Sequence, residues 1–181
     1  MTTAVLAVRS AVRHWLEKYE AGDKVLVAVS GGADSLALAY ALAAEAKKLA
    51  ITVIGVTVDH QLQSQSAIQA ELVVKQLSEM QLICVVKKVT VDIKEGLEAS
   101  ARKARYQAID EVAKAENAVA VFLGHTKDDQ AETVLLGLAR GSGTRSLSGM
   151  AHNNGIYIRP LLEISRSQNE EFCTEVGLTF W

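Results

Sequence analysis

The chain has few of the residues that several classes of protein depend on. Its 181 residues include two cysteines, one proline and 5% aromatic side chains, and the formal net charge is −2. Cys84 and Cys173 lie far apart in the sequence, so neither a disulfide framework nor a metal cluster is expected, which fits a reducing, cytoplasmic setting. Cys84 lies inside the apolar run LICVV, where a buried thiol is expected. The near-neutral charge argues against a domain built mainly to bind nucleic acid.

Long hydrophobic runs are also missing. No uncharged apolar run approaches the ~18–20 residues that a membrane span needs, so no membrane association is expected. Charges interrupt the apolar stretch of the N-terminal segment early, which is not the layout of a signal peptide. The length and the 49% of apolar residues predict one folded domain with a core rather than a disordered chain.

Short apolar runs alternate with helical patterns along the chain. Four almost continuously apolar runs predict strands that are covered on both faces, at residues 25–30, 51–59, 82–91 and 119–124. Helices are expected at 5–19, 35–49, 66–80 and 97–116, followed by a fifth strand at 156–159 and a last helix at 165–176. This order predicts an α/β fold with a doubly wound, mostly parallel five-stranded sheet and helices on both faces.

The loop after the first strand has the composition of a phosphate-binding site. Its residues are Ser30, Gly31, Gly32, Ala33, Asp34 and Ser35. The glycines let the backbone expose several N–H groups, and the following helix adds its positive end. A carboxylate beside a phosphate requires a cation between them, so Asp34 predicts Mg²⁺. The alternative is a simple helix N-cap made by Asp34 or Ser35.

Further polar residues follow the second and fourth predicted strands. The second strand ends in Asp59 and His60, although His60 equally fits a capping histidine. The fourth strand ends at Gly124 and leads through His125 to the helix that Asp129 opens. Ligands bind at the carboxyl ends of the strands in such sheets, so we expect these residues around the phosphate loop.

Two carboxylates are predicted to share one cation. Strands one and four are typically neighbours in a doubly wound sheet, so Asp34 and Asp129 are expected to flank one Mg²⁺. The spacing of His125, Asp129 and Glu132 by four and three residues is typical of one helix face. The alternative is that acidic residues stabilise the positive end of a helix, which is the preferred interpretation for Asp128.

Basic residues lie on the predicted helix at 97–116. Arg105 is suited to neutralising phosphate charge, whereas Arg102 fits that role and an i,i+4 salt bridge with Glu98 equally well. Tyr106 is expected to be packed rather than catalytic. The segment at 140–154 is rich in Gly, Ser and Asn and predicts a loop that is either a phosphate contact or a surface connection.

Five motifs in order resemble a known family. SGGADS after a first strand resembles the PP-loop of the N-type ATP pyrophosphatases. VDHQLQ, LEASARKARY, GHTKDDQAET and RGSGTRSLSGM follow in the order and spacing of the tRNA(Ile)-lysidine synthetases, which the chain closely resembles from residue 25 onward. That family usually has VDHGLR, so Gln61 and Gln63 depart from its pattern, and its D-P-[ST]-N segment is absent.

The resemblance implies an adenine nucleotide alpha hydrolase-like fold and a two-step reaction with ATP and Mg²⁺. The base oxygen O2 of the cytidine in the CAU anticodon of tRNA(Ile) attacks the α-phosphate of ATP and releases pyrophosphate. The ε-amine of free L-lysine then attacks C2 of that base, and AMP leaves. The product, lysidine, changes decoding from AUG to AUA. Expected partners are tRNA(Ile) and L-lysine, and a homodimer is a further candidate assembly.

The resemblance also assigns roles to residues. The catalytic residues that it implies are Asp34, Arg105, Asp129 and Glu132. The residues that it implies bind the metal ion are Asp34 and Asp129. The residues that it implies bind ATP are Ser30, Gly31, Gly32, Ala33, Asp34, Ser35, Asp59, His60, Gly124 and His125.

The apolar end GLTFW favours a chain that continues past residue 181, and an aromatic tail docked on the domain is the alternative. We therefore expect residues 1–181 to be a single PP-loop domain, the N-terminal part of a longer protein. The net charge of −2 agrees with a tRNA partner if most of the tRNA contacts lie in an absent C-terminal region. Two other readings stay open: an RNA-thiolating PP-loop enzyme, which generally uses paired cysteines, and an ATP-binding fragment without turnover.

Overall fold

The computed structural model describes residues 2–59, 66–90, 96–139, 141 and 148–181. The strands are β1 (Lys24–Ala28), β2 (Thr52–Asp59), β3 (Ile83–Lys88), β4 (Ala120–Phe122), β5 (Asn153–Asn154) and β6 (Tyr157–Ile158). The helices are α1 (Thr3–Leu16), α2 (Ala33–Ala46), the 3₁₀ turn η1 (Lys47–Leu49), α3 (Ser66–Glu79), α4 (Leu97–Glu116), α5 (Lys127–Ala139) and α6 (Arg166–Glu175). In this part of the chain, none of the helices combines the length and the apolarity that crossing a bilayer requires.

The strands form one sheet in the order β3-β2-β1-β4-β6-β5. All neighbours pair in parallel except β5 and β6, which are antiparallel. The α/β fold and the mostly parallel sheet are confirmed, but the sheet has six strands rather than the expected five. Asn154 precedes a two-residue turn in which Gly155 has a φ of 62°, a geometry that closes tight hairpins. This turn folds part of the expected loop at 140–154 back onto β6.

The strand β3 differs from its prediction. Its apolar sequence predicts a strand covered on both faces, but β3 lies at the edge of the sheet and Ile83 is 71% exposed. Cys84 is half-buried rather than buried. An edge strand pairs with another strand on one side only. The apolar run in the sequence does not show whether a second strand pairs with it, so it did not reveal the edge position of β3.

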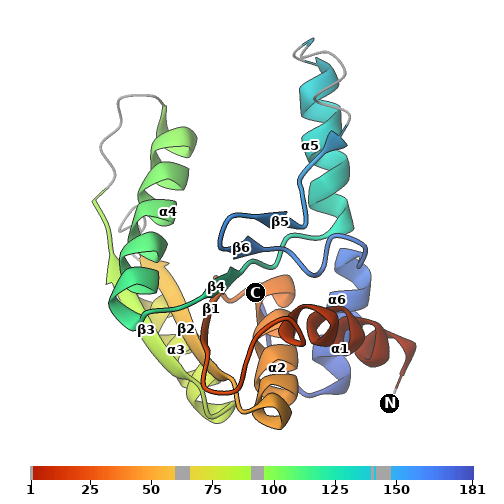
Figure 1. Ribbon diagram of the computed structural model, residues 1–181. Helices are drawn as coiled ribbons and strands as arrows, with labels where there is room; N and C mark the ends of the chain where they lie inside the picture. The colour runs from red at the N-terminus through yellow and green to blue at the C-terminus, as the bar shows by residue number, and fades with distance from the viewer. Residues whose placement is uncertain (1, 60–65, 91–95, 140, 142–147) are drawn as a thin grey trace.

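Helices cover both faces of the sheet (Figure 1). Val25 and Val27 of β1 point into a core shared with α1, α2, α3 and α6, whereas Leu26 points into a second core that α4 covers. The side chains of β1 therefore alternate between two buried faces, as expected for a central parallel strand.

A buried carboxylate joins α1 to α2. The side chain of Glu45 is 1% exposed and contacts Arg9 at 2.5 Å, Arg13 at 2.9 Å and Lys48 at 2.9 Å. Burial alone would raise the pKa of Glu45, but hydrogen bonds from these three side chains lower it to about 2. Glu45 is therefore ionised in the folded protein at neutral pH.

The topology brings two helix starts together. Strand β1 pairs with β4 on one side, as expected, and with β2 on the other. Helix α2 follows β1 and helix α5 follows β4, so both begin at the same edge of the sheet, beyond which α5 and the first part of α4 project in Figure 1. This is the edge at which doubly wound proteins bind ligands.

Candidate active site

A cavity of about 600 Å³ lies at the carboxyl ends of β1, β2 and β4. Its lining includes nine of the residues predicted from the sequence: Ser30, Gly32, Asp34, Ser35, Asp59, Arg105, Gly124, His125 and Asp129. These residues come from four separate segments of the chain. The tertiary structure thus brings most of the predicted site together in one place.

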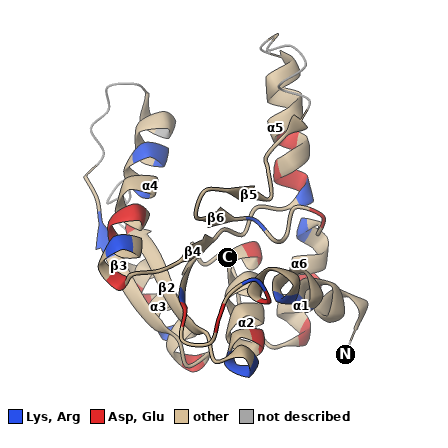
Figure 2. Cartoon of the chain, in the orientation of Figure 1, with Lys and Arg blue, Asp and Glu red and all other residues tan. Residues whose placement is uncertain are grey.

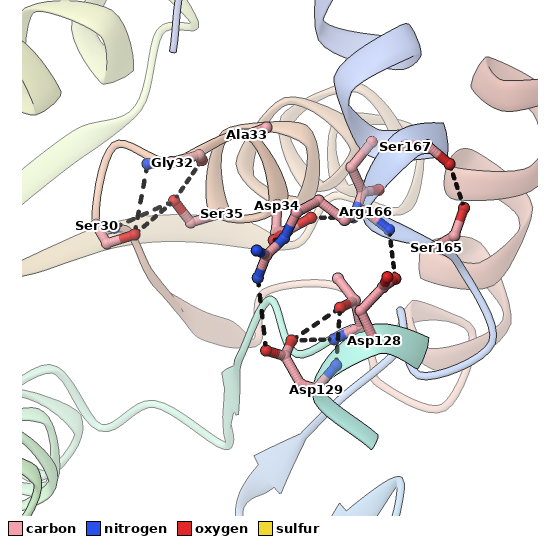
Figure 3. Close-up of polar contacts among 12 residues, drawn as sticks. Ser30, Gly32, Ala33, Asp34, Ser35, Asp128, Asp129, Ser165, Arg166 and Ser167 are labelled. Carbon is pink, nitrogen blue, oxygen red and sulfur yellow. Dashed lines mark hydrogen bonds and ion pairs between the residues drawn. The ribbon is translucent and has the colours of Figure 1, made fainter. Parts of the chain in front are cut away.

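The hydroxyl of Ser35 organises the loop between β1 and α2 (Figure 3). Its Oγ atom accepts hydrogen bonds from the backbone N–H groups of Ser30 and Gly31, both at 3.2 Å, and donates to the Gly32 carbonyl at 2.9 Å. Gly31 has a φ of 94°, a conformation that L side chains rarely adopt. The loop is therefore held as a tight turn by one buried side chain and one glycine.

Helix α2 begins without a side-chain cap. Its N-cap residue is Gly32, which makes no such hydrogen bond. The alternative that Asp34 or Ser35 caps this helix is therefore wrong, because both residues lie inside the first turn. Helix N-termini with exposed N–H groups attract anions, and this one opens onto the cavity through Gly32 and Asp34.

Gly124 lets the segment after β4 approach the start of α2. A Cβ atom at Gly124 would lie 3.1 Å from the carbonyl carbon and oxygen of Asp34 and 3.2 Å from Cα of Ser35. These distances are shorter than ordinary van der Waals contacts. A side chain here would require the backbone of Asp34 and Ser35 to shift by a few tenths of an ångström, so glycine favours the close approach of the two helix starts.

Asp34 is held by residues of α6. Its Oδ1 atom accepts a 2.7 Å hydrogen bond from Nδ2 of Asn169, and its Oδ2 atom lies 3.5 Å from Nε of Arg166. Burial raises the pKa of Asp34, Asn169 and Arg166 oppose that rise, and the negative charge of Asp129 adds to it. The two carboxylates are thus close enough to influence each other.

Asp129 combines capping with a position at the cavity. Its Oδ2 atom accepts hydrogen bonds from the N–H of Thr126 at 2.7 Å and from the Thr126 hydroxyl at 2.9 Å. Its Oδ1 atom lies 3.8 Å from the guanidinium of Arg166. The contacts with Thr126 account for one oxygen of Asp129, and the second oxygen faces Arg166, which also contacts Asp34 (Figure 3).

Comparison with known proteins agrees with this geometry. The family model described as the PP-loop domain matches residues 6–181. The chain belongs to the PP-loop domain family. It is 56% identical over 161 residues to a tRNA(Ile)-lysidine synthase of Streptomyces coelicolor and 50% identical over 178 residues to one of Thermobifida fusca. These matches cover 87% and 98% of this chain but 46% and 55% of the relatives, so the chain spans about half the length of the curated relatives it matches.

Two solved structures share the fold of this PP-loop domain. One is the U34-tRNA thiolase NcsA from Methanococcus maripaludis with its [4Fe-4S] cluster, with a TM-score of 0.83 and 20% identity, and it covers 98% of this chain and 65% of that one. The other is an NH3-dependent NAD synthetase from Campylobacter jejuni, with a TM-score of 0.61 and 15% identity, covering 97% and 72%. At these identities the likeness concerns the fold alone.

His125 lies in the wall of the PP-loop cavity as a neutral imidazole. Burial, assisted by the nearby charge of Arg159, lowers the pKa of His125 to about 4. Among the described residues its buried Nδ1 atom has no hydrogen-bond partner. His125 is thus suited to accepting or donating one hydrogen bond rather than supplying positive charge.

The basic residues of α4 separate into two environments. Arg105 lines the cavity and is partly buried, and burial lowers the pKa of its guanidinium. Arg102 is exposed, and its guanidinium lies 5.1 Å from the centre of the Tyr106 ring. The alternative partner of Arg102, Glu98, has a side chain outside the described residues. Figure 2 shows basic positions on α4 and acidic positions at the start of α5.

Some predicted residues lie elsewhere. Glu132 is exposed on α5 and is not in the cavity lining that the described residues form. Helix α5 begins at Lys127, so His125 precedes it and does not share a helix face with Glu132. Gly31 and Ala33 are buried within the PP-loop. His60 and most of the Gly-rich segment, at 140 and 142–147, lie outside the described residues.

The sequence did not predict several residues that contribute to the site. Arg166 and Asn169 of α6 contact Asp34, and Trp181 lines the cavity beside Gly31. The sequence carries a signal for the start of α6, because Ser165 and Gln168 form a capping box. It carries no signal that this helix packs against α2.

Proposed function

We propose that this PP-loop domain binds ATP with a divalent cation and activates tRNA(Ile) for the attachment of lysine. One observation carries the proposal. Asp34 and Asp129 line the same cavity, and the PP-loop and the uncapped start of α2 lie beside them. The names of relatives up to 56% identical support the choice of tRNA(Ile) and lysidine within the family.

The carboxylate pair suits Mg²⁺. In the described part of the chain there is no group of three or more His, Cys, Asp or Glu side chains that could hold a metal ion by itself. Mg²⁺ in nucleotide sites is usually held by one or two carboxylates together with phosphate oxygens and water. Asp34 and Asp129 already share one cationic group, Arg166, so their oxygens accommodate positive charge between them. A bound Mg²⁺ would neutralise phosphate charge at this point.

The residues of the chain act mainly by position and charge. We propose that the PP-loop and the start of α2 hold the phosphates and that Arg105, which lines the same cavity, stabilises charge on the α-phosphate. Attack by O2 of the anticodon cytidine forms the bond to phosphorus, and pyrophosphate leaves. The lysine amine then forms the bond to C2, and AMP leaves. We propose that Asp59, His60, Gly124 and His125 take part in ATP binding. We propose that Glu132 lies on the side from which the amine of lysine approaches.

The partners follow from this reaction. They are tRNA(Ile) with the anticodon CAU and free L-lysine. The proposed location is the cytoplasm, and a homodimer is the proposed assembly. We propose residues 1–181 as a single PP-loop domain that carries the ATP-activating part of the reaction within a longer protein. The single-stranded anticodon loop allows the target base to leave its stack and enter the cavity.

Binding and turnover test the proposal separately. Titration calorimetry with ATP and Mg²⁺ is expected to show binding that Asp34→Ala greatly weakens. Asp23→Asn, which changes a carboxylate at the opposite end of β1, is the control and is expected to bind like the wild type. Labelled lysine is expected to enter tRNA(Ile) with release of pyrophosphate. ATP binding without lysine incorporation would favour the alternative of a binding fragment, and unchanged binding in Asp34→Ala would contradict the role of Asp34.

Sulfur transfer is the second outcome of this assay, because a tRNA thiolase shares the fold. The thiols of this chain are poorly suited to it. Burial raises the pKa of Cys84 to about 11 and that of Cys173 to about 12, so neither is a ready thiolate at neutral pH. Cys173 also donates to the carbonyl of Ala33, which is a structural contact. Incorporation of labelled sulfur rather than lysine would nevertheless select the thiolase alternative.

A further inference from the structure

Arg166 is the first residue of α6 and lies between the two carboxylates of the site (Figure 3). Its backbone N–H donates to Oδ2 of Asp128 at 2.8 Å, and the capping box at Ser165 fixes the start of the helix. The side chain is 57% exposed, with Nε 3.5 Å from Asp34 and Nη2 3.8 Å from Asp129. The backbone is thus firmly placed, whereas the contacts of the guanidinium with the described residues are two long ion pairs.

The four carboxylate oxygens are divided between two kinds of partner. Oδ1 of Asp34 accepts from Asn169, and Oδ2 of Asp129 accepts from the N–H and the hydroxyl of Thr126. The two other oxygens, Oδ2 of Asp34 and Oδ1 of Asp129, are the ones that face Arg166. A metal ion bridging the two residues would therefore bind the same oxygens that the guanidinium contacts.

A guanidinium and a metal ion compete for the position between these two oxygens. Arginine stays protonated and has no lone pair to give, so it cannot join a metal coordination shell. Without a cation, two neighbouring carboxylates repel each other, and the positive charge of Arg166 reduces that repulsion. The long contacts and the exposed side chain leave the guanidinium able to turn toward a phosphate in the cavity when a metal ion arrives.

We propose that Arg166 is a positioning residue that occupies the cation position between Asp34 and Asp129 in the nucleotide-free protein. It keeps the two carboxylates aligned and is displaced by the divalent cation, after which its charge pairs with the phosphate chain of the nucleotide. The inference rests on the proposed function, because it takes the cavity to be an ATP and metal site.

Two titrations test the proposal, one of metal ion without nucleotide and one of nucleotide without metal ion. Loss of the Arg166 charge is expected to strengthen the first binding and to weaken the second. Titration of Mn²⁺ alone, followed by the electron paramagnetic resonance of free Mn²⁺, is expected to show roughly threefold to fivefold tighter binding to Arg166→Gln than to the wild type, the size of an exposed ion pair. Titration of ATP in EDTA is expected to show weaker binding by a similar factor. Arg166→Lys keeps the charge and is expected to lie between the two proteins in both titrations.

A control removes the same charge elsewhere. Lys114 is exposed in the last turn of α4, and Lys114→Gln is expected to leave both titrations unchanged. Mn²⁺ binding that is unchanged or weaker in Arg166→Gln, with a circular dichroism melting curve like that of the wild type, would overturn the proposal. Failure of the wild type to bind ATP with Mg²⁺ would instead contradict the proposed function, so the two failures are distinguishable.

Discussion

Asn169 donates a 2.7 Å hydrogen bond from Nδ2 to Oδ1 of Asp34, although 135 positions separate the two residues in the chain. Asn169 is completely buried, and one turn later in the same helix the thiol of Cys173 donates to the carbonyl of Ala33. Helix α6 therefore supports the first turn of α2 at two points. The orientation of the Asp34 carboxylate depends on a helix that carries none of the family motifs identified in the sequence.

Replacing Asn169 by Ala is expected to destabilise the protein and to change the ionisation of Asp34. The free energy of unfolding should fall by about 1–3 kcal/mol, because a partly buried carboxylate oxygen loses its donor. The pKa of Asp34 should rise further, because the hydrogen bond from Asn169 opposes the effect of burial. Urea denaturation and an NMR titration of the Asp34 carboxyl measure the two effects. Thr174→Ala changes an exposed residue of the same helix and should alter stability by less than about 0.5 kcal/mol.

Ser35→Ala is expected to loosen the PP-loop. The N–H groups of Ser30 and Gly31 lose their acceptor, which should lower the free energy of unfolding by about 1–3 kcal/mol and weaken ATP binding. Denaturant unfolding and calorimetry measure the two effects. Ser78→Ala, at an exposed position of α3, serves as the matched control. Wild-type stability and ATP affinity in Ser35→Ala would show that this hydroxyl does not organise the loop.

Gly124→Ala is expected to separate the two helix starts. The added methyl group meets the backbone of Asp34 and Ser35 at 3.1–3.2 Å, and overpacking of this kind costs about 1–3 kcal/mol of stability. The affinity for ATP with Mg²⁺ should fall as well, because the spacing of Asp34 and Asp129 changes. At Gly32 the same methyl group would meet only Oγ of Ser30, at 3.7 Å, so Gly32→Ala should lose less stability. Equal losses in both variants would contradict the close approach at Gly124.

Glu45 is expected to make the stability of the protein depend on acid pH. Its pKa is about 2 in the folded protein and 4.5 in the reference state, so its contribution is complete above pH 4.5 and is lost as the pH falls toward 2. At neutral pH, Glu45→Gln should lose up to roughly 3 kcal/mol of stability and should show a weaker pH dependence in that window. Denaturant unfolding at a series of pH values measures both effects. Glu116→Gln, which breaks a surface pair with Lys24, should change stability by no more than about 1 kcal/mol.

The sequence predicted the parts of the site that lie within single segments. Two glycines and two serines directly after a buried strand indicated a tight loop, and the loop has that form at Gly31 and Ser35. The alternation of apolar runs and helical patterns indicated the parallel sheet, because these patterns reflect local burial. The pairing of β1 with β4 followed from general rules of doubly wound sheets, and it brought Asp34 and Asp129 to one edge as expected.

Tertiary structure alone decided which side chains complete the site. Arg166 and Asn169 reach Asp34 because α6 packs against α2, and no spacing in the sequence encodes a contact over more than a hundred residues. The same holds for β3, whose apolar sequence is that of a central strand although it occupies an edge. Local patterns indicate which segments form strands and helices, whereas the neighbours of each segment, and so its burial, are fixed by packing of the whole chain. The amino-acid sequence therefore determined the PP-loop and its carboxylates, and the fold decided how their charge is balanced.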